Sequence, residues 1–264
     1  MATLLSQSVG KLTIDSLADV GRGFSLIRDV ARQVPYAWRM RREVLEQMHL
    51  VAVGSLPMVL VTAIFVGAVT AVQAVYQMQA YVPMVFLGTV VSKSVFIELG
   101  PVVTALVVGG RLCANYAAEL GTMKVTEQLD AMEMLAVDPV RYLAMPRYLA
   151  AVTMLPVIVV IANAIAVISA YFVSVATLDV TSSTFKEGLF LFYDPDDLIG
   201  GLVKTVFFGG IIAQSGVYYG FNTEGGAEGV GAATMKAVVG SCLSILIADY
   251  LLATVLFQVL FEAS

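Results

Sequence analysis

The stretch VAVGSLPMVLVTAIFVGAVTAVQAVY, residues 51–76, decides the fold class, because it is apolar almost throughout and carries no charged side chain. A helix of about 20 such residues is long enough to cross the hydrocarbon core of a bilayer. No Lys, Arg, Asp or Glu occurs between Glu46 and Lys93. We therefore predict a first membrane span at about 51–75.

Four further segments have the same apolar character. The composition is 59% hydrophobic and 13% charged, and the mean hydropathy is +0.86, far more apolar than a water-soluble domain. The apolar segments predict spans at about 84–112, 148–178, 198–218 and 235–261. We therefore expect an all-α integral membrane protein with an N-terminal region over 1–46 and one five-span membrane domain over 47–264.

The distribution of basic residues predicts the orientation, since cytoplasmic connections are enriched in Lys and Arg. With the N-terminus inside, most of the basic residues lie on the cytoplasmic side, namely Lys11, Arg22, Arg28, Arg32, Arg39, Arg41, Arg42, Arg111, Lys124, Arg141, Arg147 and Lys236. Only Lys93, Lys186 and Lys204 fall in or near the outer half. We expect a cytoplasmic N-terminus and a C-terminus on the opposite side.

Apolar residues recur at helical spacing before the first span. They are Leu17, Val20, Phe24, Ile27, Ala31 and Val34, and charged residues lie off this stripe. The pattern is typical of an amphipathic helix in the membrane interface, which Pro35 should end. Trp38 and the arginines that follow it would anchor the entry to the first span. A soluble helix packed on a partner is the alternative.

Charged residues crowd into the connection between the second and third spans. They are Glu119, Lys124, Glu127, Asp130, Glu133 and Asp138. Beside them runs an apolar stripe at helical spacing, formed by Val125, Leu129, Met132 and Ala136. The pattern predicts a cytoplasmic amphipathic helix over 119–138. It fits a helix that docks into a soluble motor and, equally, a solvated helix without a partner.

Enzyme signatures are absent from the sequence. It contains no G-x-x-x-x-G-K-[ST] loop, no H-E-x-x-H and no G-x-S-x-G, and His49 is its one histidine. Cys113 and Cys242 lie far apart and suggest neither a disulfide framework nor a metal site. We expect a non-catalytic chain without a cofactor or metal of its own.

Ionisable residues inside the predicted spans are candidates for function, because each costs roughly 2.5–3.5 kcal/mol on insertion scales. Glu98 begins the motif ELGP, in which Gly100 and Pro101 predict that the second span bends or opens. Lys93 lies five residues earlier. It either reaches toward the outer interface or contacts an anionic ligand.

Two more charges lie in the later spans. Asp249 could bind a coupling ion, although a hydrogen bond to another helix is the commoner use of such a residue. Lys204 lies seven residues after Asp197 and on roughly the same face of a helix. We expect a structural ion pair between Lys204 and Asp197.

Three segments together resemble a known family. ELGTMKVTEQLDAMEMLAVDPVRYLAMPR (119–147), IELGPVVTALVVGGR (97–111) and GAEGVGAATMKAVVGSCLSILIADYLLATVLF (226–257) closely resemble the MlaE (YrbE) permease family of ABC transporters. The likeness spans roughly residues 50–262, and the first segment is long enough to be highly specific. The N-terminal forty residues fit the family's interfacial helix only in kind.

The resemblance implies a homodimeric permease of the bacterial inner membrane, with its C-terminus in the periplasm. Such a permease works with two copies of a cytoplasmic ATPase, which carries ATP and Mg, with a periplasmic MCE-domain hexamer and with a small cytoplasmic accessory protein in some systems. The implied cargo is phospholipid moved between the inner and outer membranes, and no nucleic acid is involved.

The resemblance also assigns roles to residues. The segment that matches the family's coupling helix would dock in the ATPase through Glu119, Lys124, Glu127, Asp130, Glu133, Asp138 and Arg141. Glu98 occupies the position of a polar residue in the lipid pocket. Many members have Arg before this Glu, whereas this chain has Ile97. We hypothesise that Lys93, one turn before Ile97, supplies the missing cationic contact to a lipid phosphate.

Two other classes of function stay open on the residues alone. An ion-coupled secondary transporter would use Glu98 and Asp249 as proton or cation sites, and its transport would follow the proton gradient rather than nucleotide. A membrane scaffold for envelope proteins would hold no lipid and would tolerate changes at Glu98. The missing nucleotide motif together with a coupling-type helix favours the ABC permease.

Overall fold

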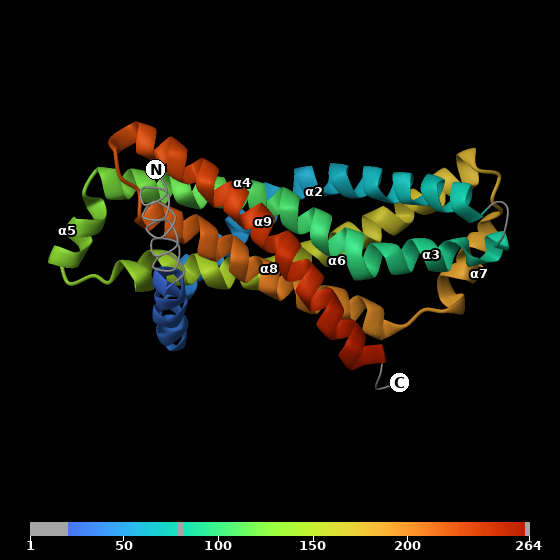
Figure 1. The fold of residues 1–264 in the computed structure, drawn as a ribbon, viewed down its shortest axis with the longest axis horizontal. Coiled ribbons are helices and arrows are strands. Elements are labelled where there is room, and N and C mark those ends of the chain that lie inside the picture. The colour runs from blue at the N-terminus through green and yellow to red at the C-terminus, as the bar shows by residue number, and fades with distance from the viewer. Residues whose placement is uncertain (1–20, 79–81, 262–264) are drawn as a thin grey trace, which may run out of the picture.

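The computed structural model describes residues 21–78 and 82–261, and within these ranges the chain is helical and contains no strand. Long helices run side by side along the molecule (Figure 1). The described part contains five helical segments long and apolar enough to cross a membrane. They are α2 (Arg41–Met78), the run of α3 and α4 (Leu87–Ser94 and Gly100–Val125), α6 (Met145–Thr177), α8 (Pro195–Phe221) and α9 (Gly226–Phe261). The prediction of an all-α membrane protein with five spans is confirmed.

Several helices extend beyond the predicted spans. α2 begins at Arg41 rather than near 51, and α9 begins at Gly226 rather than near 235. The reason is that charged residues mark where a helix leaves the hydrocarbon, whereas the helix itself continues into water. At the start of α9, Gly225 and Gly226 have φ angles of 88° and 68°, a backbone conformation that glycine adopts without steric cost.

The bundle is built on close contacts between small residues. A Cβ at Gly67 of α2 would lie 1.9 Å from the carbonyl oxygen of Ala166 on α6, so only glycine fits there. One turn away the Ser169 hydroxyl of α6 donates a hydrogen bond to the Ile64 carbonyl of α2 at 2.7 Å. In a bilayer, where lipid is as apolar as a side chain, such packing and hydrogen bonding hold helices together.

α9 lies at the edge of the bundle. Only 11% of its most apolar stretch is buried, compared with 28–39% in the other four spans. Large side chains along its length are exposed, namely Met235, Val239, Leu243, Leu246, Ile247, Tyr250, Leu251 and Val255. Lipid or another subunit must therefore cover this face of α9 in a membrane.

The two ends of the bundle carry different short helices (Figure 1). At one end α5 (Gln128–Met134) joins α4 to α6. At the other, α7 (Ser182–Leu191) lies against α3. A Cβ at Gly88 would lie 2.4 Å from the Phe185 carbonyl oxygen, so the two backbones touch. α7 thus packs against α3, the N-terminal part of the second span.

The prediction of one helix over 119–138 is wrong. α4 continues to Val125, α5 is only two turns long, and Glu127 and Ala136 have φ angles of 60° and 58° between and after these helices. The connection must reverse the chain so that α6 can run back beside α4, and it turns at these two residues. Neither is glycine, so the sequence gives no sign of the turns. We call residues 126–139, which the distribution of basic residues predicts to be cytoplasmic, the inner connection.

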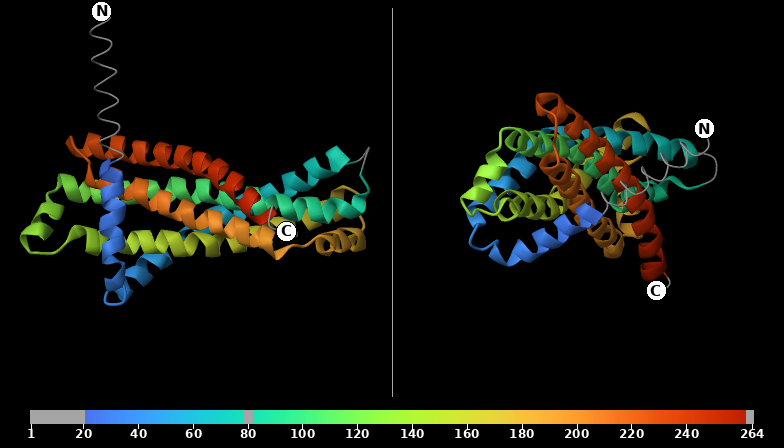
Figure 2. Two further views of the ribbon diagram at one scale, coloured as in Figure 1. Left: turned by 60° about the horizontal axis from the view of Figure 1, so that its bottom comes forward. Right: turned by 60° about the vertical axis from the view of Figure 1, so that its left-hand side comes forward.

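The N-terminal helix lies across the bundle (Figure 2). Residues 21–33 are helical, and the chain then forms a turn at Val34–Tyr36, which contains Pro35 as predicted. Phe24 and Ile27 are exposed, whereas Val30 is buried against the bundle. The predicted apolar stripe thus faces away from the protein over its described part. Leu17 and Val20 lie outside the described residues.

Candidate functional site

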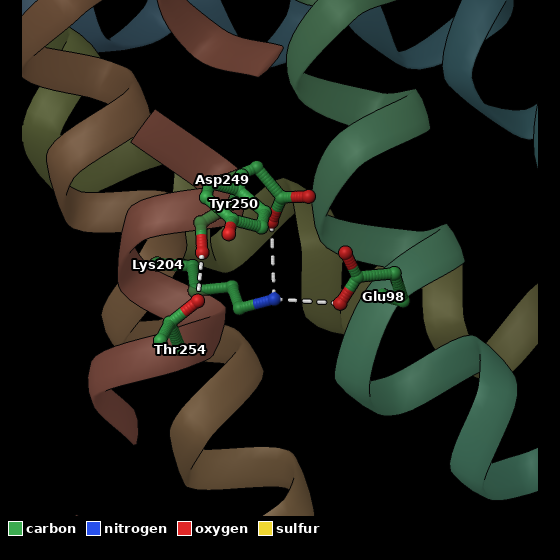
Figure 3. A network of polar contacts seen from close by, with 5 residues as sticks. All are labelled: Glu98, Lys204, Asp249, Tyr250 and Thr254. Atoms are coloured by element: carbon green, nitrogen blue, oxygen red, sulfur yellow. Dashed lines mark hydrogen bonds and ion pairs between the residues drawn. The ribbon is translucent and has the colours of Figure 1, made fainter. Parts of the chain in front are cut away.

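Three charged side chains from distant parts of the sequence meet inside the bundle. The Lys204 ammonium nitrogen lies 2.6 Å from Glu98 Oε2 and 3.0 Å from Asp249 Oδ1 (Figure 3). Glu98 follows α3, Lys204 lies on α8 and Asp249 on α9. We call these three residues the central cluster.

The three members of the central cluster differ in burial. The side chain of Lys204 is 2% exposed and that of Asp249 13%, whereas that of Glu98 is 43% exposed. A buried ammonium group without a partner would be very costly, and here two carboxylates lie within hydrogen-bond distance of the Lys204 nitrogen. With both carboxylates ionised the cluster carries a formal charge of −1. Its open side is at Glu98, where a polar ligand could approach.

A π-helical turn at Val95–Leu99 positions Glu98. Here the Gly100 N–H bonds to the Val95 carbonyl, five residues back, and Pro101 has no N–H to continue the regular ladder. A π turn adds one residue to a helical turn and rotates the side chains that follow, and such turns are frequent at functional sites. Where the sequence predicts that the second span bends or opens, the structure has a π turn within a continuous helical run, and this turn directs Glu98 toward α8.

Two close contacts hold this π turn between its neighbours. A Cβ at Gly201 of α8 would lie 2.1 Å from the Phe96 carbonyl oxygen, and one at Gly100 would lie 1.7 Å from Asn163 Oδ1 on α6. Both glycines are therefore required by the approach of a neighbouring group. Because Gly201 lies three residues before Lys204, the same contact sets the distance between Lys204 and Glu98.

Asn163 has unused hydrogen-bonding capacity beside the π turn. Its residue exposure is 2%, and among the described residues neither Nδ2 nor Oδ1 has a hydrogen-bond partner. A buried amide in this state costs about 1–3 kcal/mol. The π turn in the second span is thus flanked by a polar group that the observed conformation does not satisfy.

The expected pair of Lys204 with Asp197 is wrong. Lys204 bonds to the central cluster, and Asp197 instead accepts from Lys93, whose ammonium nitrogen lies 2.7 Å away. Side chains two turns apart on one helix compete with partners on neighbouring helices, and those partners lie closer here. Lys93 is therefore engaged with α8, and Ile97, half-buried in the π turn, carries no charge. The predicted contact of Lys93 with a lipid phosphate, and the predicted place of Ile97 at the lipid site, stay predictions.

Asp249 forms the helix-to-helix hydrogen bond that was the commoner expectation for it, to Lys204 of α8. Sequence reasoning missed Lys204 as the centre of the cluster. The signal available was that Glu98 and Asp249 are acidic residues in predicted spans, and that Lys204 is a basic residue able to neutralise them. Their spacing along the chain does not reveal that all three lie at one depth.

Charged residues near the inner connection mostly pair within the chain. Lys124 lies 2.9 Å from Asp130, and the two side chains are 37% and 54% exposed. Arg147, whose side chain is 3% exposed, lies 2.7 Å from Glu119, which is half-exposed. The ion pair between Glu119 and Arg147 therefore links α4 to α6.

Asp138 and Arg141 also bond within the chain. Asp138 Oδ1 accepts from the Val140 N–H at 2.9 Å and thereby caps the π turn Val140–Ala144 before α6. Its other oxygen accepts from Gln33, and Arg141 donates to the same Gln33. By contrast, Glu127 and Glu133 are exposed at the surface of the connection.

The tip of the inner connection is apolar. Met134 and Leu135 are 89% and 78% exposed, although the predicted stripe residue Leu129 is buried against the bundle. Beside α5 lies a hollow of about 190 Å³, lined by Lys124, Leu129, Asp130, Glu133, Asp138, Pro139, Val140 and Phe221. The exposed apolar tip thus lies next to a hollow lined by three acidic residues and one lysine.

Within residues 21–78 and 82–261, no group of three His, Cys, Asp or Glu side chains is arranged to hold a metal ion. Cys113 and Cys242 are free thiols. Five apolar spans with ionisable residues paired among them are typical of a multi-spanning transport protein.

Comparisons with known proteins give the family. The model of the permease MlaE family matches residues 44–255, and the chain belongs to that family. A probable ABC transporter permease protein of Rickettsia bellii is 40% identical over 97% of this chain and 94% of its own length. The intermembrane phospholipid transport system permease protein MlaE of Haemophilus influenzae is 32% identical over 95% of this chain and 96% of its own.

Proposed function

We propose that this chain is the membrane-spanning permease subunit of a transporter that moves phospholipid between the inner and outer membranes of a bacterium. The observation that carries the proposal is the central cluster, a buried Lys204 shared by two carboxylates and open at Glu98. The printed function of the Haemophilus influenzae relative supports phospholipid as the cargo. The chain itself is not an enzyme.

The chemistry of the cluster suits a phospholipid headgroup. A phosphate needs a cation, and Lys204 is the nearest one to the open side of the cluster. Glu98 would accept hydrogen bonds from an amine or hydroxyl of the headgroup when Lys204 turns to the phosphate. Lys93 and Ile97, on the outer side of Glu98, would line the entrance, and Lys93 would contact the phosphate after releasing Asp197.

The energy would come from a separate ATPase that binds ATP and Mg. Two copies would dock on a homodimer of this chain, each receiving the apolar tip at Met134 and Leu135 with the acidic residues Glu127 and Glu133 around it. The largely uncovered face of α9 would form the dimer contact, which places the central cluster beside it. The names of the relatives as ABC transporter permeases support an ATPase partner.

The arrangement in the cell follows from the same proposal. The chain lies in the inner membrane with the inner connection and the N-terminus in the cytoplasm and the C-terminus in the periplasm. A periplasmic MCE-domain hexamer would pass lipid to or from the outer membrane, with a small accessory protein on the ATPase in some systems.

The test is transport by the reconstituted complex. The chain is purified with the proteins that accompany it and placed in vesicles holding labelled phospholipid, and lipid movement is measured with ATP, without ATP and with a proton gradient. We expect movement that requires ATP. Movement that follows the proton gradient alone would identify a secondary transporter, and no bound or moved lipid would identify a scaffold.

A further inference from the structure

The N-terminal helix is attached to the start of the third span through one glutamine. Gln33 Nε2 donates to Asp138 Oδ2 at 3.0 Å, and Arg141 Nε donates to Gln33 Oε1 at 2.8 Å. The Arg141 guanidinium also lies 4.2 Å from the centre of the Tyr36 ring. Both ends of the Gln33 amide are therefore used. We call Gln33, Tyr36, Asp138 and Arg141 the Gln33 clasp.

One member of the clasp, Asp138, is also hydrogen-bonded to the backbone of the chain. The second oxygen of Asp138 accepts from the Val140 N–H, so Asp138 is bound to the backbone at which the inner connection becomes the third span. Any displacement of that backbone would move the two atoms to which Gln33 is bonded. All three polar side chains are partly buried, which strengthens their hydrogen bonds relative to an exposed set.

Apolar packing continues the same contact. Val30, one turn before Gln33, is buried in a cluster with Leu129 of the inner connection, Leu143 of the π turn and Val217 of α8. Nearer its start, the helix is attached to the bundle, where Gln214 of α8 donates to the Gly23 carbonyl at 3.1 Å. The N-terminal helix thus bridges α8 and the inner connection.

The chain runs from this helix through a turn at residues 34–40 into α2. α4 and α6 are joined covalently to the inner connection, but α2 is not. The start of α2 meets that connection through the Gln33 clasp, the turn at Tyr36 and the packing of Val44 in the same apolar cluster as Leu129. α2 is also the helix that packs most extensively on α6, as at Gly67. A displacement of the connection that moved α6 without moving the start of α2 would shear this contact.

We propose that Gln33 is a positioning residue that couples α2 to the inner connection. When the inner connection is displaced, three spans (α2, α4 and α6) then move with it, rather than α4 and α6 alone. This inference rests on the proposed function, because it takes the inner connection as the place where the ATPase acts. It adds the N-terminal helix to the moving part of the transporter. Gln33 itself contacts neither lipid nor nucleotide.

The test uses variants that break the clasp and one that repairs it. Gln33→Leu removes both hydrogen bonds at similar volume, and Asp138→Asn turns an acceptor toward Gln33 into a donor. Adding Gln33→Glu to Asp138→Asn restores every contact, because the introduced amide donates to the introduced carboxylate, which still accepts from Arg141. Gln47→Leu, near the start of α2, is the matched control.

The measurement is phospholipid moved per ATP hydrolysed by the assembled complex in vesicles. We expect Gln33→Leu to lower this ratio at least about fivefold, the lower range of typical coupling between sites, with assembly on the ATPase unchanged. Asp138→Asn should lower the ratio by a similar factor. The double variant and Gln47→Leu should move as much phospholipid per ATP as the original chain.

Two results would overturn the inference. In one, Gln33→Leu transports with the original ratio. In the other, the double variant moves as little phospholipid per ATP as Asp138→Asn does. That result would mean that the hydrogen bond between residues 33 and 138 does not determine the coupling. A failure of the proposed function looks different, because then the original complex shows no ATP-driven lipid movement in the first place.

Discussion

The central cluster and the inner connection are both groups of charged residues in an apolar chain, but they differ in burial and in how the chain assembles them. At the connection, opposite charges lie a few residues apart and reach water, as for Lys124 and Asp130. In the cluster, Glu98 and Lys204 are 106 residues apart and the cation is buried. Charge in water can be exchanged or removed at little cost, whereas buried charge needs its partners.

Removing the buried cation should have the largest effect. Lys204→Met leaves Glu98 and Asp249 facing each other without a cation, and breaking a buried ion pair in this way costs about 3–5 kcal/mol. We expect a large loss of folded protein and of transport, measured as the yield and melting temperature of the purified chain. Lys236→Met, at an exposed lysine of α9, is the control. Equal melting temperatures for the two variants would contradict the account.

Changing the geometry of the central cluster without changing its charge should have the second-largest effect. Gly201→Ala places a Cβ 2.1 Å from the Phe96 carbonyl oxygen, so the π turn or α8 must shift. We expect a cost of about 1–3 kcal/mol for overpacking and a loss of transport greater than the loss of stability. Gly210→Ala is the control, since a Cβ there meets nothing within 4 Å. Full transport by Gly201→Ala would show that the spacing is not critical.

The buried cation at the inner end should give an intermediate effect on stability. Arg147→Met removes the pair with Glu119, but Glu119 is half-exposed and regains water. The variant also loses the hydrogen bond from Arg147 to the Leu143 carbonyl. We expect about 2 kcal/mol of destabilisation, within the range for hydrogen bonds to charged groups. A melting temperature as low as that of Lys204→Met would mean that stability does not depend on how many carboxylates are left unpaired when the buried cation is removed.

The exposed pair should matter least for stability. Lys124→Met breaks the contact with Asp130, and exposed pairs contribute about 0.2–1 kcal/mol. We expect an almost unchanged melting temperature and, if this surface meets the ATPase, a weaker association with it. The two readouts are thermal unfolding and the binding of purified ATPase. A large loss of stability here would remove the distinction between the two groups of charges.

The sequence predicts well whatever depends on neighbouring residues. Apolar length gives all five spans, and Gly100 with Pro101 predicts a departure from the regular helix, which the structure has as the π turn at Val95–Leu99. The density of charge around Asp130 also marks the inner connection correctly, because its residues are close in sequence. These features are local, and periodicity and residue type report local structure.

The features that failed depend on distant partners or on turns without a characteristic residue. Nothing near Lys204 in the sequence indicates that α9 brings Asp249 to it, so the nearer Asp197 was the expected partner. The reversals at Glu127 and Ala136 use a backbone conformation usually marked by glycine, and none is present. Tertiary packing determines both the partner of Lys204 and these two turns. The residue pattern of a single helix carries no information about that packing.

The most direct test of the central claim is the amount of phospholipid that the purified chain holds at the cluster. Glu98→Gln keeps the size of the half-exposed side chain and removes its charge, so the fold should be retained. Bound phospholipid per chain is measured by mass spectrometry for the original protein and for this variant at equal melting temperature. We expect bound phospholipid in the original protein and a clear fall in the Glu98→Gln variant. An unchanged amount of bound lipid would contradict the central claim.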